Sequence, residues 1–274
     1  MISLELPFDK EREKALNKQS PTEDHCSRKI TKDTIIIVDG KPAVILLTKL
    51  DVVDLFMAVK KINNFYQGSR GSGLKNEARV FGFSPRMPTR NHHDYCSISN
   101  MSIEFPEAHK KLMEWGITAS DLYKKHSKEM WTDHKKWITD NIRSEWLMPK
   151  SVFSSGIVNR TSQLKYHYDR GNIENGWSCM FTLKDGIQGG DLSIPGLDVT
   201  VSLPHGSALL FNGQKILHGV TPIHRRKPGA ERYTIVYYTL AQMRNCMSPA
   251  DEIKRAQKIR DSRETSWLQT RAQK

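Results

Sequence analysis

Two histidines, one aspartate and one arginine in the second half of the chain have the types and order needed for metal chemistry. His167 and Asp169 are separated by one residue, His218 follows 51 positions after His167, and Arg232 is 14 positions further on. Two imidazoles and one carboxylate form the facial triad that holds non-haem Fe(II) and leaves positions open for a co-substrate and O₂. A buried guanidinium suits a bidentate carboxylate, here the distal carboxylate of 2-oxoglutarate. We therefore predict an iron site at His167, Asp169 and His218, with Arg232 anchoring 2-oxoglutarate.

The His-x-Asp spacing is informative only together with the later residues, because isolated pairs of this kind are frequent by chance. If the chain is extended at 163–168, the alternation of side chains puts His167 and Asp169 on the same side. Turn-and-strand patterns at 189–195 and 203–211 then lead to His218. We expect this β-rich stretch to bring the three ligands together.

The elements around these residues are short strands broken by Gly, Asn and Pro, a pattern typical of a sandwich or jelly roll. The expected strands are 152–158, 163–168, 177–184, 191–194, 198–202, 207–211 and 232–240. Upstream, Asp39-Gly40 between two β-branched runs predicts a hairpin over 34–47. A helical pattern follows at 52–65, and 106–146 is also helical, with Ser120 as a predicted N-cap.

The two ends of the chain differ from the middle. Residues 1–33 are polar and charged, and we expect a loosely packed arm. Residues 246–274 are expected to form a charged C-terminal helix that begins at Ser248. Between them we predict a single α+β domain over 34–245, with an α/β part at 34–150 and a jelly-roll core at 151–245.

The 274 residues carry a formal net charge of +12, which suggests a polyanionic partner, most simply nucleic acid. One basic group, His224 to Lys227, lies in the loop between His218 and Arg232. Positive charge beside a metal pocket is what phosphate positioning requires. Ordinary solvated loops are the simpler alternative for these charges.

Cysteine spacing and hydropathy bear on location. Cys26, Cys96, Cys179 and Cys246 are scattered without a C-x-x-C pair, which argues against a zinc ribbon and a disulfide framework and favours a reducing compartment. No run of about 18 apolar residues predicts a membrane span. The N-terminus lacks the basic-then-apolar order of a secretory signal. We expect a cytoplasmic monomer that is neither secreted nor attached to a membrane.

Together these motifs resemble the TET/JBP group of Fe(II)- and 2-oxoglutarate-dependent DNA dioxygenases, including its small bacteriophage 5-methylpyrimidine members. The matching stretches are 153–159, 167–172, 189–190, 218–220 and 232–238, with 79–86 as an upstream segment. The resemblance implies a double-stranded β-helix core that uses Fe(II), 2-oxoglutarate and O₂. It also implies oxidation of a pyrimidine 5-methyl group in DNA, 5-methylcytosine foremost, to 5-hydroxymethylcytosine and onward to formyl and carboxyl forms. For a phage-encoded member, the location would be the host cytoplasm.

The resemblance implies roles for residues that bind the base. A methyl group inside a duplex is out of reach of buried iron, so the nucleotide must flip out. Asn172, five positions after His167, matches a residue that contacts the flipped base. Tyr238, six positions after Arg232, matches a tyrosine that stacks on it.

Other positions implied by the resemblance contact the co-substrate or the DNA. Asn159 and Thr234 match residues that contact 2-oxoglutarate. Arg86 and Arg90 are the candidates for an arginine that bridges co-substrate and DNA. TET enzymes carry a base-reading histidine where Leu240 stands here, and their cysteine-rich zinc region has no counterpart, so the residue that would separate 5-methylcytosine from thymine is not identified.

Three alternatives stay open at this point. The chain could hydroxylate thymine in DNA with the same chemistry. It could be a non-catalytic DNA-binding β-sandwich with a degenerate metal site, against which the intact triad and Arg232 speak. It could also be a protein or small-molecule hydroxylase whose basic loops are incidental.

Overall fold

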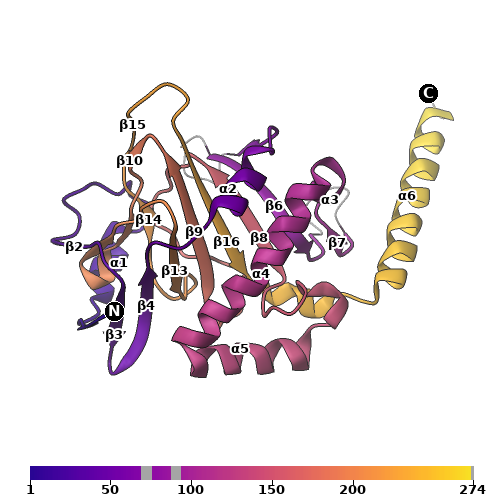
Figure 1. Ribbon diagram of the computed structural model, residues 1–274. Coiled ribbons are helices and arrows are strands. Elements are labelled where there is room, and N and C mark those ends of the chain that lie inside the picture. The colour runs from indigo at the N-terminus through magenta and orange to yellow at the C-terminus, as the bar shows by residue number, and fades with distance from the viewer. Residues whose placement is uncertain (69–75, 88–93, 273–274) are drawn as a thin grey trace.

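A large β-sheet forms the centre of the computed structural model, which describes residues 1–68, 76–87 and 94–272 (Figure 1). The sheet has ten strands, and β16 lies in it between β8 and β9. Its strands are β1 (Ile2–Glu5), β3 (Thr34–Val38), β4 (Lys41–Leu47), β5 (Tyr66–Gly68), β6 (Asn76–Ser84), β7 (Ser97–Ile98), β8 (Ser155–Arg160), β9 (Ser178–Asp185), β13 (Ser207–Phe211) and β16 (Glu231–Tyr238).

A smaller sheet and a short strand pair complete the β-structure. The four-stranded sheet has the order β14-β11-β12-β2, and β10 pairs with β15. These strands are β2 (Arg28–Ile30), β10 (Ile187–Gly189), β11 (Leu192–Ile194), β12 (Val199–Val201), β14 (Gly219–Val220) and β15 (Ile223–Arg225). The helices are α1 (Lys10–Leu16), α2 (Val53–Lys60), α3 (Met101–Glu104), α4 (Pro106–His126), α5 (Lys128–Asn141) and α6 (Pro249–Ala272).

The large sheet has a separate hydrophobic core on each face. Phe181 of β9 packs toward α4, where its ring meets Trp115 at 5.1 Å between centroids. Its neighbour Met180 joins the core shared with Ile194 and Val199 of the small sheet. Successive side chains of a strand point to opposite faces, so one strand contributes to both cores. This arrangement of helices, large sheet and small sheet confirms the predicted α+β class with a jelly-roll core.

Several predicted elements are confirmed and two are wrong. The hairpin over 34–47 and the strand at 207–211 are present as β3, β4 and β13. Residues 163–168 form no strand, and only an isolated bridge links His167 to His218. Ser120 is not an N-cap, because α4 continues through it to His126 and the break comes at Ser127. The buried Ser120 hydroxyl instead accepts a hydrogen bond from the Trp131 indole at 3.1 Å.

The N-terminal arm, residues 1–33, is packed against the body, which corrects the expectation of loose packing. Its strand β1 pairs in parallel with β3, and β2 pairs in parallel with β12 of the small sheet. Leu6 and Glu13 are buried, with exposed fractions of 3% and 0%. The local sequence is polar, but long-range pairing with strands on both sheets holds the arm in place.

A disulfide joins Cys96 and Cys246, which are 150 positions apart. The cysteine spacing argued against a disulfide framework, and this bond corrects that expectation. It also removes the support that the spacing gave to a reducing compartment. Cys26 and Cys179 are buried free thiols. The pairing was invisible in the sequence because only the tertiary fold brings these two segments together.

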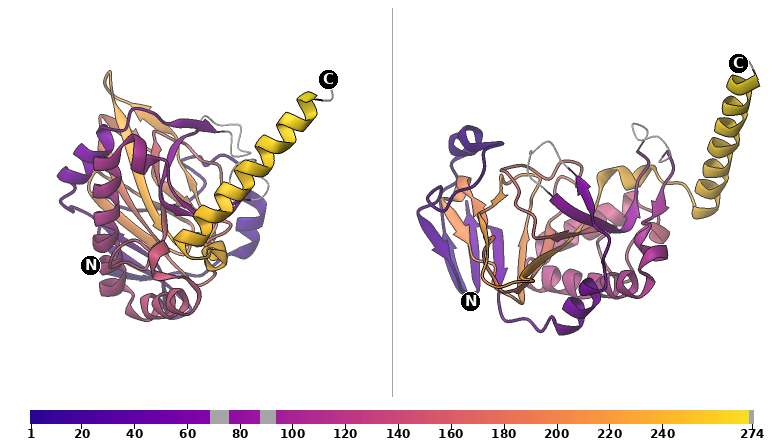
Figure 2. Two further views of the ribbon diagram at one scale, coloured as in Figure 1. Left: turned by 90° about the vertical axis from the view of Figure 1, so that its right-hand side faces the viewer. Right: turned by 90° about the horizontal axis from the view of Figure 1, so that it is seen from above.

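The first turns of α6 contact the body through Glu252 and Arg255, and its C-terminal end projects away from the rest of the molecule (Figure 2). Its start agrees with the prediction, since the Ser248 hydroxyl accepts a hydrogen bond from the Asp251 N–H at 3.2 Å. Of the helices in the described part of the chain, none is both long and apolar enough to cross a membrane.

Candidate metal centre

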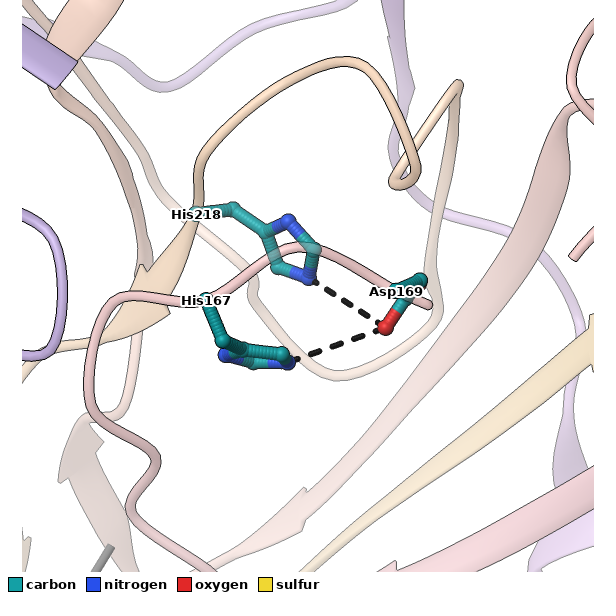
Figure 3. A group of neighbouring side chains, drawn as sticks. All are labelled: His167, Asp169 and His218. Atoms are coloured by element: carbon teal, nitrogen blue, oxygen red, sulfur yellow. Dashed lines mark ion pairs between the residues drawn. The ribbon is translucent and has the colours of Figure 1, made fainter. Parts of the chain in front are cut away.

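The three predicted ligands converge in space (Figure 3). Asp169 Oδ1 lies 3.7 Å from His167 Nε2 and 3.8 Å from His218 Nε2. One ligand atom from each residue falls within 4.8 Å of the others, a spacing that a single metal ion can bridge. The site therefore has the two imidazoles and one carboxylate of a facial triad.

The triad is held by loop backbone, not by a strand as the sequence suggested. The N–H of Asp169 donates to the Gly213 carbonyl oxygen at 2.8 Å, just after β13. A Cβ on Gly213 would lie 2.3 Å from Asp169 Oδ2, so only glycine allows this approach. Because His218 follows in the same loop, β13 and its loop place the aspartate and the second histidine together.

Both histidines have the tautomer that metal binding requires. His167 Nδ1 donates to the Lys165 carbonyl at 2.7 Å, and His218 Nδ1 donates to the Ile216 carbonyl at 2.9 Å. A carbonyl only accepts, so each proton resides on Nδ1 and each Nε2 presents a lone pair toward Asp169. Burial, with a smaller contribution from His167, lowers the pKa of His218 to about 4, which keeps that imidazole neutral. The residues fit Fe(II).

Arg232 is a buried guanidinium, and no described residue forms an ion pair with it. The residue is 1% exposed, and its Nε and Nη2 have no hydrogen-bond partner among the described residues. Burial lowers its pKa to about 10. A buried cation with two unpaired donors destabilises the folded protein unless an anion binds to it. These donors fit one carboxylate of 2-oxoglutarate.

The remaining residues expected at the co-substrate lie together on adjacent strands. Thr234 of β16 is paired in register with Asn159 of β8, and both are buried. Asn159 Nδ2 donates to Thr234 Oγ1 at 3.4 Å. Since Arg232 lies two residues before Thr234 on β16, its backbone position is on the same face of the strand.

The two residues expected at the base lie at the loop after the triad and at the end of β16. Asn172 is 7% exposed, its Nδ2 donates to Ser178 Oγ at 3.4 Å, and it forms an isolated bridge with Leu240. Tyr238 is half-buried at the last position of β16, opposite Ser155 of β8. Leu240 is two positions after Tyr238, so the bridge places Asn172 beside the chain segment that carries Tyr238.

The two arginines expected near the DNA have different outcomes. Arg86 forms an ion pair with Glu252 of α6, with Nη2 and Oε1 2.6 Å apart. Glu252 is buried, and it also accepts from the backbone N–H groups of Cys96 and Met247 at 2.9 Å each. Arg90 lies outside the described residues. The ion pair therefore holds Arg86 at α6.

Two charged residues near the site were missed in the sequence, the fully buried Glu13 and the mostly buried Lys184. Glu13 lies in the arm, in a run of charges indistinguishable from a solvent-exposed face. Lys184 of β9 donates to the Gly189 carbonyl at 2.7 Å and lies 3.4 Å from Asp191 Oδ1. Burial lowers the pKa of Lys184 to about 8. No local pattern marks either residue, because their burial depends on distant segments.

Comparison with known proteins places the fold and the site in one family. The model of the Tet/JBP family, described as the oxygenase domain of the 2OGFeDO superfamily, matches residues 90–241. A bifunctional helicase and thymine dioxygenase JBP2 from Trypanosoma brucei brucei is 27% identical over 140 residues. That alignment covers 51% of this chain and only 12% of the relative's length.

A solved structure of similar fold covers most of the chain. NgTET1 in complex with 5mC DNA superimposes with a TM-score of 0.56 over 89% of this chain and 95% of that one, at 16% sequence identity. At this identity the likeness concerns the fold. The family match takes in more than half of the chain and includes all three triad residues and Arg232. The chain belongs to the Tet/JBP family of iron- and 2-oxoglutarate-dependent oxygenases.

Proposed function

We propose that the protein hydroxylates the methyl group of 5-methylcytosine in DNA, with Fe(II), 2-oxoglutarate and O₂ as cofactor and co-substrates. The observation that carries the proposal is the convergence of His167, Asp169 and His218. When bound, iron and 2-oxoglutarate supply the oxidising chemistry that inserts oxygen into an unactivated C–H bond and releases succinate. The product would be 5-hydroxymethylcytosine, and further rounds would give the formyl and carboxyl forms.

The chain's own residues have distinct parts in this proposal. His167, Asp169 and His218 hold the metal, and Arg232 pairs with the distal carboxylate of 2-oxoglutarate. Thr234 and Asn159 contact the same co-substrate and fix its orientation. His218, Arg232, Thr234 and Asn159 are buried, which limits access of water to the co-substrate.

DNA is the proposed substrate because of the net charge of +12 and the two relatives named above, one a thymine dioxygenase and one solved with 5mC DNA. The target nucleotide must flip out of the duplex to reach the metal. We assign Asn172 to contact the flipped base and Tyr238 to stack on it. Arg86 would have to leave Glu252 to reach DNA, and Arg90 is the second candidate for that contact.

Thymine in DNA is the second candidate substrate, and the sequence similarity to a protein named as a thymine dioxygenase favours it. The two bases differ at N3 and at the 4-substituent, whereas the methyl group to be oxidised is the same. The same triad therefore serves both reactions.

Mass spectrometry of nucleosides tests the proposal directly. The protein is incubated with Fe(II), 2-oxoglutarate and duplex DNA that contains both 5-methylcytosine and thymine, with Asp169→Ala as the inactive control. We expect 5-hydroxymethylcytosine, together with an equal or larger amount of succinate. 5-Hydroxymethyluracil alone would replace the proposed substrate by thymine, and DNA binding without oxidised nucleoside or succinate would mean a non-catalytic DNA-binding protein.

A further inference from the structure

Glu13 is a fully buried carboxylate in α1, with an exposed fraction of 0%. Three groups donate to it. Its Oε1 accepts from the Leu217 backbone N–H at 2.6 Å, and its Oε2 accepts from the Tyr168 hydroxyl at 2.8 Å. The Lys10 ammonium, one turn earlier in α1, donates to Oε2 at 2.9 Å. The carboxylate is therefore buried with its donors and a counter-ion in place.

Two of these donors belong to the two separate segments that carry the metal ligands. Tyr168 stands between His167 and Asp169, and Leu217 immediately precedes His218. One carboxylate thus contacts both the first and the second ligand segment. A two-way backbone hydrogen bond between His167 and His218 also links the two segments. The Glu13 carboxylate adds a side-chain connection at the adjacent residues Tyr168 and Leu217.

The same arm makes further contacts with the first ligand segment. The Lys18 N–H donates to the Tyr166 carbonyl at 3.0 Å, and the Tyr166 N–H donates to the Gln19 carbonyl at 2.9 Å. Pro21 approaches Gly219, where a Cβ would lie 2.6 Å from the proline ring. Residues 13–21 therefore contact both ligand segments.

Loss of the Glu13 carboxylate would leave the Leu217 N–H buried without a partner. An unsatisfied buried donor costs on the order of 1–3 kcal/mol, which the loop can avoid only by moving. A movement at Leu217 shifts His218, and a movement at Tyr168 shifts both neighbouring ligands. The Glu13 side chain therefore couples the geometry of the triad to the arm.

We propose that Glu13 is a positioning residue that fixes the orientation of the three metal ligands. The N-terminal arm then contributes to the metal centre by orienting its ligands, although the arm lies outside the oxygenase region matched at 90–241. This inference rests on the metal centre of the proposed function. Its test concerns metal affinity and needs no DNA.

The experiment is a titration of metal-free protein with Co(II), followed by visible absorption, with the melting temperature of each metal-free variant measured in parallel. Glu13→Ala is expected to weaken Co(II) binding about 10- to 100-fold, as loss of groups that orient metal ligands generally does. Glu13→Gln keeps an acceptor for Leu217 and is expected to restore most of the affinity. Tyr168→Phe, which removes one hydroxyl, is expected to weaken binding by a smaller factor.

Arg12→Ala is the matched control in the same helix. Arg12 pairs with Asp198 at 2.9 Å and donates to the His25 carbonyl at 2.7 Å, so its loss loosens the arm without removing a contact to Tyr168 or Leu217. This variant is expected to melt at a lower temperature and to bind Co(II) like the wild type. Equal weakening in Arg12→Ala and Glu13→Ala would overturn the specific role of Glu13.

The outcomes separate the two proposals. Wild-type protein that binds no Co(II) would overturn the metal centre and the positioning role together. Wild-type binding with unchanged affinity in Glu13→Ala would overturn the positioning role alone. If Glu13→Ala does not fold, Tyr168→Phe decides, and an affinity equal to that of the wild type would overturn the proposal.

Discussion

The main chains of His167 and His218 are hydrogen-bonded to each other in both directions. The His167 N–H donates to the His218 carbonyl at 2.9 Å, and the His218 N–H donates to the His167 carbonyl at 3.1 Å. The two rings lie 4.5 Å apart between centroids. This backbone pair therefore holds the two histidine segments side by side, and the side-chain contacts around it orient the ligands.

Asp169→Ala should abolish both metal binding and turnover. The substitution removes the one carboxylate that lies within 4 Å of both Nε2 atoms, and two imidazoles alone do not make a facial triad. Co(II) titration and succinate release would check this. Asp140→Ala is the control, because Asp140 pairs with Lys136 on the exposed face of α5. Full activity in Asp169→Ala would refute the metal assignment.

Arg232→Met should raise the KM for 2-oxoglutarate about 10- to 100-fold, since hydrogen bonds to charged groups are worth about 1.5–3 kcal/mol. The same change should raise the melting temperature of the ligand-free protein, because it removes a buried guanidinium with two unpartnered nitrogens. Added 2-oxoglutarate, with Mn(II), should stabilise the wild type but not the variant. An unchanged KM would place the co-substrate anchor elsewhere.

Tyr238→Ala should reduce kcat/KM on methylated DNA roughly 5- to 150-fold, because the substitution removes about 1–3 kcal/mol of base stacking. Tyr238→Phe keeps the ring and should stay close to the wild type. Steady-state kinetics on a single-site duplex would measure both. If Tyr238→Ala left KM and kcat on DNA unchanged, the residue would not belong to the base pocket.

DNA binding should weaken steeply with salt. Each phosphate contact contributes a slope of about −0.9 to the log–log plot of affinity against salt concentration. Arg225 and Arg226, at the exposed end of β15, are our candidates for such contacts. The double substitution Arg225→Ala/Arg226→Ala should make the slope shallower by about 2, measured by fluorescence anisotropy. A DNA affinity of the wild type that does not change with salt concentration would show that the protein makes no phosphate contacts.

Stability should fall as the pH is lowered, in part through His134. Burial lowers the pKa of His134 from its ordinary 6.5 to about 3 in the folded protein. The unfolded chain binds this proton near pH 6.5, so the contribution is fully present above that pH. It is lost as the pH falls toward 3, at up to about 1.4 kcal/mol per pH unit.

His134→Gln should show a weaker pH dependence of unfolding between pH 6.5 and 4, measured by urea denaturation. Glutamine does not titrate and can still hydrogen-bond to Thr239 Oγ1, which lies 3.0 Å from His134 Nε2. The buried His109 also has a lowered pKa, so some slope will remain. A slope identical to that of the wild type would exclude His134 as a source of acid sensitivity.

The sequence by itself determined the elements whose pattern is local. The Asp39-Gly40 turn, the strand at 207–211 and the C-terminal helix from Ser248 all follow from periodicity and turn chemistry. It also supplied the chemistry of the site, because the ligand types at His167, Asp169 and His218 can be read without coordinates.

The tertiary structure alone decided how those residues meet. His167 and Asp169 lie in a loop that is hydrogen-bonded to Gly213 and His218, and Glu13 is buried against Leu217. Arg86 is paired with Glu252, and Cys96 is bonded to Cys246. Each of these contacts joins segments far apart in the chain. The sequence shows the spacing of apolar residues, about 2 residues in strands and 3.6 in helices. The burial of a side chain and its hydrogen-bond or ion-pair partner depend on every segment that packs around it.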